Sequence, residues 1–399
     1  MTIKRIVYFV LGPFSERDYF RFGVDCFENS GFSVEVWDFT PLLFPHVYET
    51  IEVRKPFNYS RLRFINSKDQ ALEAVALLTE PASFVICFVP YGINTYFLYR
   101  ALSRHKIKYS VFMANAMPFT ACSSYRVREI IKRISLKEVF NKVRNLTAAK
   151  IAEIFFFKIK LAVLRIKPAA LRLVGGEKSA VMYKYPVNEK TETVWLHTLD
   201  YDVFLKNEQV NPQVDENRIV FLDEDMVFYP GYLYLGVKPF VSPDQYFKLL
   251  CAFFKHLESQ HKKRVIIAAH PRSQYEKLPD YFEGRQLIKG KTAELIRDSA
   301  CVIVHASTSL NFAVLYNKPV IFVTTDELDR SIEGVWIHNV ATQFNKSVYN
   351  LNSSTEADIT GELTVDAKVY RKYKNDYIKK EGSAEQPFWQ AVLNRIKSY

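Results

Sequence analysis

Two short apolar runs in the second half of the chain, residues 264–269 (RVIIAA) and 301–304 (CVIV), decide the fold. Both runs have the length and the β-branched content of buried strands in a parallel sheet. The first run ends in His270-Pro271-Arg272, and the second ends in the polar segment 305–310 (HASTSL). Because ligands bind at the carboxyl ends of the strands in open α/β sheets, we expect these two segments to form one binding site.

The second polar segment has the composition of a phosphate site. Apolar residues recur at helical spacing over 310–316, which places Ser307-Thr308-Ser309 at the start of a helix. Hydroxyls and free backbone N–H groups in that position are suited to bind a phosphate. The loop His270-Pro271-Arg272 would complete the site from the neighbouring strand. His305 is a further candidate, although its place beside the apolar run also fits a side chain that faces the core.

Strand and helix patterns alternate along the whole chain. In the first half, strands are expected at 5–10, 33–37, 83–89, 109–113, 171–174 and 192–196, with helices at 16–29, 71–78 and 94–104. A second series has strands at 218–222, 264–269, 301–304 and 320–323 and helices at 243–258, 292–298, 310–316, 366–377 and 386–398. This alternation predicts an α/β fold of two Rossmann-like domains that face a cleft. We expect an N-terminal domain at 1–201, a linker at 202–216 and a C-terminal domain at 217–399.

The bulk composition restricts the class of protein. With 399 residues, of which 48% are hydrophobic and 24% charged, the chain is globular and long enough for two domains. Its five cysteines are scattered and form no Cys-x-x-Cys pair, which argues against a disulfide framework or a zinc site and favours a reducing cytoplasm. The loop after the first strand lacks Gly-x-Gly-x-x-Gly, so we expect no dinucleotide cofactor.

The net charge of +11 is concentrated in one segment. Residues 126–172 contain 13 Lys and Arg residues against 3 Glu residues, so the rest of the chain is close to neutral. This distribution argues against nucleic-acid binding. The cations alternate with apolar residues, which predicts one or two basic amphipathic helices inserted in the N-terminal domain. They are either ordinary surface helices or a docking surface for the anionic inner face of the cytoplasmic membrane.

Candidate acids and bases lie at two expected strand ends. Asp223-Glu224-Asp225 follows the strand at 218–222, and His197 and Asp200 follow the strand at 192–196. Each position offers a group that can take a proton from a substrate hydroxyl. Asp223 and Asp225 also have the spacing of a metal-binding pair, but a complete βαβ domain precedes them, so we expect no metal.

At His270-Pro271 and Ser307-Thr308-Ser309 the chain resembles the GT-B glycosyltransferases that use CMP-activated acidic sugars, the bacterial sialyl-, polysialyl- and Kdo-transferase group. The resemblance implies that both motifs hold the phosphate of a nucleotide donor. It covers about residues 218–325, and it extends to the N-terminal half only through the Rossmann pattern. The segment 306–323 (ASTSLNFAVLYNKPVIFV) is also similar to capsule and surface-polysaccharide proteins in general.

The resemblance further implies inverting, metal-independent transfer from a nucleotide-sugar donor to a surface glycan or lipid-linked glycan acceptor, without a cofactor. The related transferases carry an Asp/Glu-Asp/Glu-Gly motif that supplies the general base. The nearest match is Asp223-Glu224-Asp225, with Asp in place of Gly. Three alternatives stay open: a nucleotide-sugar 2-epimerase, a CDP-polyol phosphotransferase on the same fold, and a non-catalytic protein of polysaccharide assembly.

Overall fold

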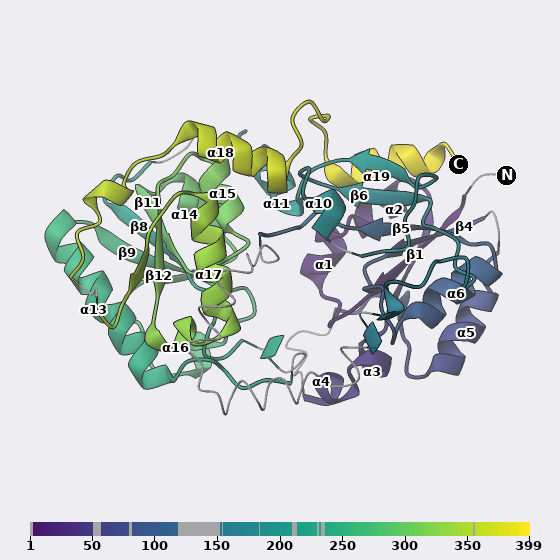
Figure 1. Ribbon diagram of the computed structural model, residues 1–399, viewed down its shortest axis with the longest axis horizontal. Helices are drawn as coiled ribbons and strands as arrows, with labels where there is room; N and C mark the ends of the chain where they lie inside the picture. Colours follow the sequence, from purple (N-terminus) through teal and green to yellow (C-terminus); the bar gives the residue numbers. More distant parts are fainter. Residues whose placement is uncertain are drawn as a thin grey trace. The chain divides into compact units, whose positions relative to one another are not determined.

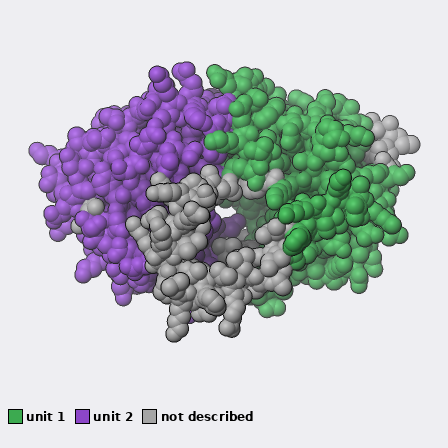
Figure 2. All heavy atoms as spheres, in the orientation of Figure 1, with its two compact units in different colours: residues 1–116, 140–199, 379–399 green, residues 117–139, 200–378 purple. Residues whose placement is uncertain are grey.

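The computed structural model describes residues 3–50, 57–79, 82–118, 152–153, 155–182, 184–209, 214–229, 231–232, 236–353 and 356–399. The chain forms two compact units, which Figure 1 and Figure 2 show as ribbons and as atoms. Unit 1 consists of the described residues of Met1–Ala116, Phe140–Leu199 and Lys379–Tyr399. Unit 2 consists of the described residues of Met117–Val139 and Asp200–Ile378.

Unit 1 is built on a seven-stranded sheet in the order β3-β2-β1-β4-β5-β6-β7, and its neighbouring strands pair in parallel. Its strands are β1 (Arg5–Val10), β2 (Ser33–Asp38), β3 (Leu62–Phe64), β4 (Ser83–Cys87), β5 (Lys108–Phe112), β6 (Leu171–Val174) and β7 (Glu192–Trp195). Its helices are α1 (Glu16–Arg21), α2 (Val24–Asn29), α3 (Thr40–Leu43), α4 (Pro45–Thr50), α5 (Lys68–Ala76), α6 (Tyr96–Arg104), α10 (Ser179–Met182) and α19 (Phe388–Lys397).

Unit 2 repeats the arrangement with a six-stranded parallel sheet in the order β10-β9-β8-β11-β12-β13. Its strands are β8 (Arg218–Leu222), β9 (Arg264–Ala269), β10 (Leu287–Lys289), β11 (Cys301–Val304), β12 (Val320–Thr324) and β13 (Val348–Asn350). Its helices are α11 (Leu199–Asn207), α13 (Pro243–His261), α14 (Thr292–Arg297), α15 (Leu310–Leu315), α16 (Asp326–Asp329), α17 (Ile332–Gln343) and α18 (Ala367–Tyr373), with shorter turns at Tyr275–Lys277, Thr360–Glu362 and Lys374–Ile378.

Both sheets have the strand order of a doubly wound Rossmann fold, so the predicted fold class is confirmed. In each sheet the order reverses at one point, between β1 and β4 in unit 1 and between β8 and β11 in unit 2. The loops after the two strands at such a point diverge to opposite faces and leave room for a ligand. In unit 2, these loops begin at Asp223 and His305.

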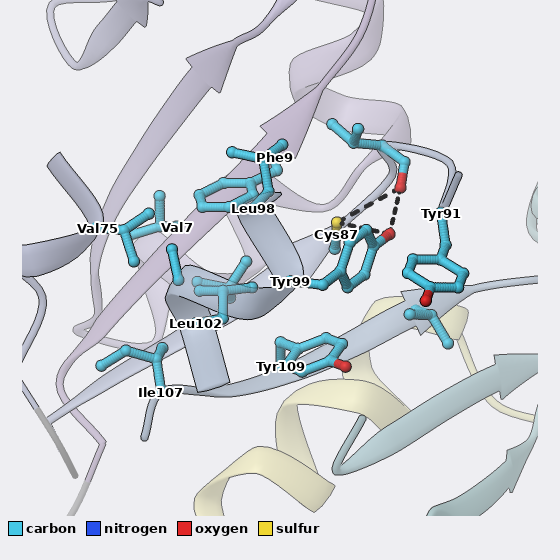
Figure 3. Close-up of a cluster of buried hydrophobic side chains, with 14 of the residues drawn as sticks. Val7, Phe9, Val75, Cys87, Tyr91, Leu98, Tyr99, Leu102, Ile107 and Tyr109 are labelled. Carbon is cyan, nitrogen blue, oxygen red and sulfur yellow. Dashed lines mark hydrogen bonds between the residues drawn. The ribbon is translucent and has the colours of Figure 1, made fainter. Parts of the chain in front are cut away.

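The core of unit 1 is a dense apolar layer with few polar atoms. Val7 and Phe9 of β1 and Leu98 and Leu102 of α6 are fully buried within it (Figure 3). The hydrogen bonds drawn there join Cys87, Tyr99 and the Val89 carbonyl, which accepts from both side chains. A hydroxyl and a thiol are therefore buried with partners, as a dry core requires.

The C-terminal segment corrects one expected domain boundary. Residues 379–399, which we assigned to the second domain, pack into unit 1. Trp389 of α19 is 5% exposed, and its indole N–H donates to the Arg21 carbonyl at 2.8 Å. The sequence pattern predicts this helix and its apolar face, but not the sheet that the face covers. The expected linker 202–216 is also partly wrong, because α11 extends to Asn207.

Gly23 explains why the single helix expected at 16–29 is two helices. Its φ of +65° lies in the left-handed region, which breaks the helix between α1 and α2. A Cβ atom at this position would lie 2.2 Å from Trp389 Cγ. Gly23 is thus required both by its backbone conformation and by the close approach of α19.

The basic segment falls mostly outside the described residues, which leave out 119–151 and 154. In the described part from 155 to 167, a short helical stretch gives way to turns, so the one or two helices expected in 126–172 do not extend through these residues. Among the described residues, no helix combines the length and the apolar character that a membrane crossing needs.

Replacing Trp389 with Ala should destabilise unit 1 by about 3–5 kcal/mol, because the change leaves a large cavity in a well-packed core. Urea unfolding measures the loss, and hydrogen exchange of the β1 and β4 amides assigns it to unit 1. The control is Leu77→Ala, whose side chain is 71% exposed and whose loss should matter little. Faster exchange in β8 and β11 alone would contradict the assignment of α19 to unit 1.

Candidate functional site

The candidate site of unit 2 lies at the carboxyl ends of three adjacent strands. β8 lies between β9 and β11, with Leu222 beside Ala268 and Phe221 beside Ile303. The loops that follow these strands begin at Asp223, His270 and His305, so the sheet brings together the three segments that the sequence singles out. All three belong to the same unit, and the point of strand reversal lies among them.

Asp223 links the end of β8 to the loop after β9 by hydrogen bonds. Its carboxylate is 4% exposed and accepts hydrogen bonds from the His270 backbone N–H at 3.2 Å and from the Tyr275 hydroxyl at 3.0 Å. It also accepts the Asp225 backbone N–H at 3.0 Å. Burial raises the pKa of Asp223 to about 6, although these hydrogen bonds act in the opposite direction. Since protein donors take most of its lone pairs, the carboxylate is poorly suited to bind a metal ion.

Glu224 fastens the β8 end to the β11 loop on the other side. Its Oε1 atom accepts the Ala306 backbone N–H at 2.8 Å. Burial raises the pKa of Glu224 to about 8, and the charges of Glu333 and Asp223 add to the effect. Glu333 lies in the first turn of α17, and burial raises its own pKa to about 7. Two carboxyls therefore titrate in the neutral range at the point of strand reversal.

The His270 ring lies partly buried at the end of β9. Its Nδ1 atom accepts the backbone N–H of Arg272 at 3.2 Å, which fixes the orientation of the imidazole. The ring packs edge-on against Tyr229, with centroids 5.3 Å apart. Pro271 and Arg272 are exposed. The structure thus brings His270 and Arg272 to the expected edge of the sheet, with the guanidinium in solvent.

His305 corrects the prediction that it binds the donor. Its side chain is fully buried, with Nδ1 2.8 Å from the Val323 carbonyl oxygen and Nε2 2.8 Å from the Tyr246 hydroxyl. Burial lowers the pKa of His305 to about 4, so the ring is neutral at pH 7. Nδ1–H then donates to Val323, and Nε2 accepts from Tyr246. His305 is therefore a core residue that joins β11 to β12 and α13.

The hydroxyl triplet forms the turn that enters α15. Ser307 Oγ accepts the Ser309 backbone N–H at 3.2 Å, so this hydroxyl caps the turn. Thr308 is exposed and Ser309 is partly buried. Capping occupies one of the three hydroxyls, and the side chains of Thr308 and Ser309 remain at the surface of the same loop.

The two remaining candidates, His197 and Asp200, lie in different units. The His197 ring is fully buried, and each ring nitrogen lies 2.9 Å from a backbone carbonyl oxygen, of Thr198 and of Gln386. It has no ring nitrogen left for a substrate hydroxyl, which corrects its expected role as a base. Asp200 is partly buried in α11 and accepts a hydrogen bond from the Asn311 amide at 3.1 Å. Asn311 ties Asp200 to the helix that follows the hydroxyl triplet.

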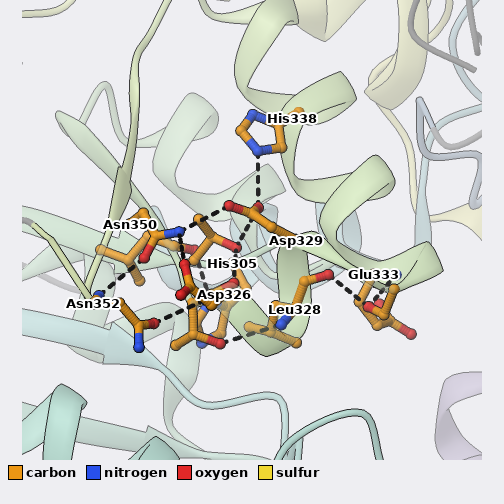
Figure 4. Close-up of polar contacts among 12 residues, drawn as sticks. His305, Asp326, Leu328, Asp329, Glu333, His338, Asn350 and Asn352 are labelled. Atoms are coloured by element: carbon orange, nitrogen blue, oxygen red, sulfur yellow. Dashed lines mark hydrogen bonds and ion pairs between the residues drawn. The ribbon is translucent and has the colours of Figure 1, made fainter. Parts of the chain in front are cut away.

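A polar network at the ends of β12 and β13 was missed by the sequence analysis. Asp329 accepts hydrogen bonds from Thr324, His338 and Asn350 at 2.9–3.0 Å (Figure 4). Burial alone would raise the pKa of Asp329, but the hydrogen bonds from His338 and Thr324 outweigh it and lower the pKa. This network joins the middle of α17, through His338, to the ends of β12 and β13. The only sequence signal was the Ser331 cap before that helix.

Comparisons with known proteins support the fold and no finer assignment. No family model matches the chain, and no curated protein matches it. Solved structures do match. The calicheamicin glycosyltransferase CalG4 has 12% identity and a TM-score of 0.53, with 99% of this chain and 98% of that chain covered. MnaA from S. aureus, solved with UDP, has 12% identity and a TM-score of 0.48, with 100% and 97% covered.

MurG from Acinetobacter baumannii has 9% identity and a TM-score of 0.47, with 99% of this chain and 100% of that chain covered. The matched structures are GT-B glycosyltransferases and UDP-GlcNAc 2-epimerases, and nothing in them is specific to CMP-sugar transferases. At these identities the likeness shows the fold alone, which is the two-domain GT-B arrangement of parallel sheets.

Replacing Glu224 with Gln should change how stability depends on pH. The folded carboxyl keeps its proton up to about pH 8, whereas the unfolded chain releases it near pH 4.5. The wild type therefore loses stability as the pH rises from 5 to 8, and the variant, which keeps the Oε1 acceptor, does not. Between pH 5 and pH 8 the variant should therefore gain about 3–4 kcal/mol of stability relative to the wild type.

Urea unfolding at pH 5, 6, 7 and 8 measures the difference. Glu208→Gln removes an exposed carboxylate just after the end of α11 and controls for the loss of one charge. If the wild type and E224Q lose stability in parallel across this range, Glu224 does not titrate as the structure requires.

Proposed function

We propose that the chain is a glycosyltransferase that moves a sugar from a nucleotide donor to a glycan acceptor. One observation carries the proposal. The loops after β8, β9 and β11 meet at the point of strand reversal, where Asp223 and Glu224 hold the His270 loop and the hydroxyl triplet beside each other. In doubly wound sheets this is the position at which nucleotide phosphates bind.

The donor phosphate, in this proposal, lies between His270 and the triplet Ser307-Thr308-Ser309. A histidine N–H, two hydroxyls that capping leaves at the surface and an exposed arginine offer donors of both kinds, neutral and charged. These groups stabilise the negative charge that develops as the nucleotide leaves. Arg272 supplies the positive charge from the β9 loop.

The reaction that we propose inverts the configuration at the anomeric carbon of the donor sugar. An acceptor hydroxyl attacks that carbon, the bond from the carbon to the donor phosphate oxygen breaks, and the nucleotide leaves with the electron pair. A base takes the hydroxyl proton. Glu224 is our choice for this base, because Ala306 fixes its Oε1 atom and its pKa of about 8 lies near neutral pH.

Asp223 is assigned a different task, since its buried carboxylate already holds the β9 loop. It positions His270 and does not exchange protons with the acceptor. Asp200 is the alternative base, held by Asn311 next to the triplet. The pH profile of turnover separates the two, because a base with the pKa of Glu224 gives a rate that rises up to about pH 8.

The donor class rests on the two motifs alone. His270-Pro271 together with Ser307-Thr308-Ser309 favours a CMP-activated acidic sugar, such as a nonulosonic acid or a Kdo-like sugar, and a surface or lipid-linked glycan acceptor. An epimerase needs no glycan acceptor, and a CDP-polyol phosphotransferase forms a phosphodiester. Product analysis with CMP-sugars, CDP-polyols and UDP-sugars, each with and without acceptor, therefore distinguishes the three.

Replacing His270 with Ala should lower turnover about 10²-fold or more, because a donor aimed at the leaving phosphate is lost. The fold should be retained, since the ring is partly exposed and Asp223 contacts only its backbone. The matched control is His261→Ala, at the last residue of α13. Chelation with EDTA should leave turnover unchanged. Turnover near the wild-type rate in H270A would overturn the donor-site assignment.

A further inference from the structure

One described segment of unit 1, residues 155–165, has both buried and exposed apolar side chains. Part of it is built into the core, where Phe156 is 5% exposed and packs against Tyr91 and Tyr96 at centroid distances of 5.2 and 5.9 Å. Leu161 and Leu164 pack against the same core from positions further along the segment. The segment is therefore anchored to unit 1.

The same segment also exposes large apolar side chains to solvent. Phe155 is 61% exposed, Ile159 is 41% exposed and Val163 is 72% exposed. All three lie within nine residues of chain, in the same segment as the core-packed Phe156 and Leu161. A single exposed apolar side chain needs no explanation, but three that are large and close in sequence indicate a contact surface.

Exposed cations are interleaved with these apolar groups. Lys158, Lys160 and Arg165 are all exposed, and the Lys158 ammonium lies 5.5 Å from the centre of the Phe155 ring. No acidic side chain in the described part of the chain forms an ion pair with any of the three. The exposed apolar side chains are therefore interspersed with cations that form no ion pair with a carboxylate of the described residues.

The wider segment has the same character in its sequence. Residues 126–172 hold 13 Lys and Arg residues against 3 Glu residues. Nucleic acids are bound by cations with stacking or hydrogen-bonding side chains, and exposed Ile and Val contribute neither. Aliphatic and aromatic side chains flanked by Lys and Arg instead suit the headgroup region of an anionic bilayer, where the apolar groups enter the acyl boundary and the cations meet lipid phosphates.

We propose that residues 155–165 form a docking surface, the 155–165 ledge, that binds unit 1 to an anionic lipid bilayer. The partner is the membrane surface itself, without insertion of a spanning helix. The proposal does not depend on the transferase activity, since it rests on exposure and charge in unit 1 alone. If both proposals hold, the ledge brings the enzyme to acceptors that are linked to lipid.

The test is co-sedimentation of the full chain with vesicles of phosphatidylcholine, with and without about a third of phosphatidylglycerol. The wild type should bind the anionic vesicles and should bind the neutral vesicles about tenfold more weakly or not at all. Binding should weaken as the salt concentration rises. Equal binding to both vesicles, or no binding to either, would overturn the proposal.

Two triple variants separate charge from insertion. Lys158→Gln, Lys160→Gln and Arg165→Gln together remove the charge, and Phe155→Ser, Ile159→Ser and Val163→Ser together remove the exposed apolar side chains. Each should reduce binding to anionic vesicles about tenfold or more. Because all six side chains are exposed, thermal unfolding should show both variants folded.

Matched controls change the same chemistry elsewhere on the surface. Lys248→Gln, Lys255→Gln and Arg371→Gln remove three exposed cations, and Leu77→Ser, Val214→Ser and Val237→Ser remove three exposed apolar side chains. Both controls should bind vesicles like the wild type. If the apolar variant also binds like the wild type, and soluble heparin competes fully with vesicles, the surface recognises polyanions and the membrane proposal is wrong.

Discussion

The candidate site depends on one kind of interaction. Two consecutive carboxyl groups accept hydrogen bonds from backbone N–H groups in the loops that follow the neighbouring strands. Asp223 accepts the His270 amide on one side, and Glu224 accepts the Ala306 amide on the other. In a doubly wound sheet the two loops at the point of reversal diverge. The acidic pair at the end of β8 holds the backbone of both loops, and these loops carry the His270 imidazole and the hydroxyl triplet.

This arrangement lowers the stability of unit 2, because it buries carboxyl groups. Burial raises the pKa of Asp223 to about 6 and that of Glu224 to about 8, which means that their ionised forms are disfavoured where they stand. Glu333 adds a third carboxyl with a raised pKa. Proteins commonly place such groups at sites where a proton must move near neutral pH. In our proposal, the carboxyl group that is destabilised at the end of β8 is also the group that accepts the proton.

The sequence predicted the longer strands and helices, because their hydrophobic patterns are local. The strands β8, β9 and β11 are long and apolar enough to identify, and the structure brings the polar segments that follow them to one edge of the sheet, as expected. The strands β3, β10 and β13 were missed because each has three residues, too few to show a periodicity. The break at Gly23 was missed because an isolated glycine within a helical pattern can be tolerated, and here a left-handed φ ends the helix.

The histidines show where such patterns fail. His270 and His305 each follow an apolar run, yet one ring lies at the surface and the other is buried against Tyr246. The direction of a side chain at a strand end depends on the pleat of the strand and on the helix that packs beside it. The apolar sequence of the strand determines neither. His197 is bound by the carbonyl of Gln386, a partner 189 residues away, which no local pattern identifies. The same limitation applies to α19, whose amphipathic face predicts burial without naming the sheet.

The most direct test of the donor site is hydrogen–deuterium exchange of the full chain with CMP, measured beside UDP and GDP. The account predicts slower exchange with a bound nucleotide in three stretches of unit 2, at 223–226, 270–275 and 305–312, because each would lie against the phosphate. CMP should protect them at the lowest concentration. Protection confined to the strand ends of unit 1, or no protection by any of these nucleotides, would contradict the claim that the loops held by Asp223 and Glu224 bind the donor.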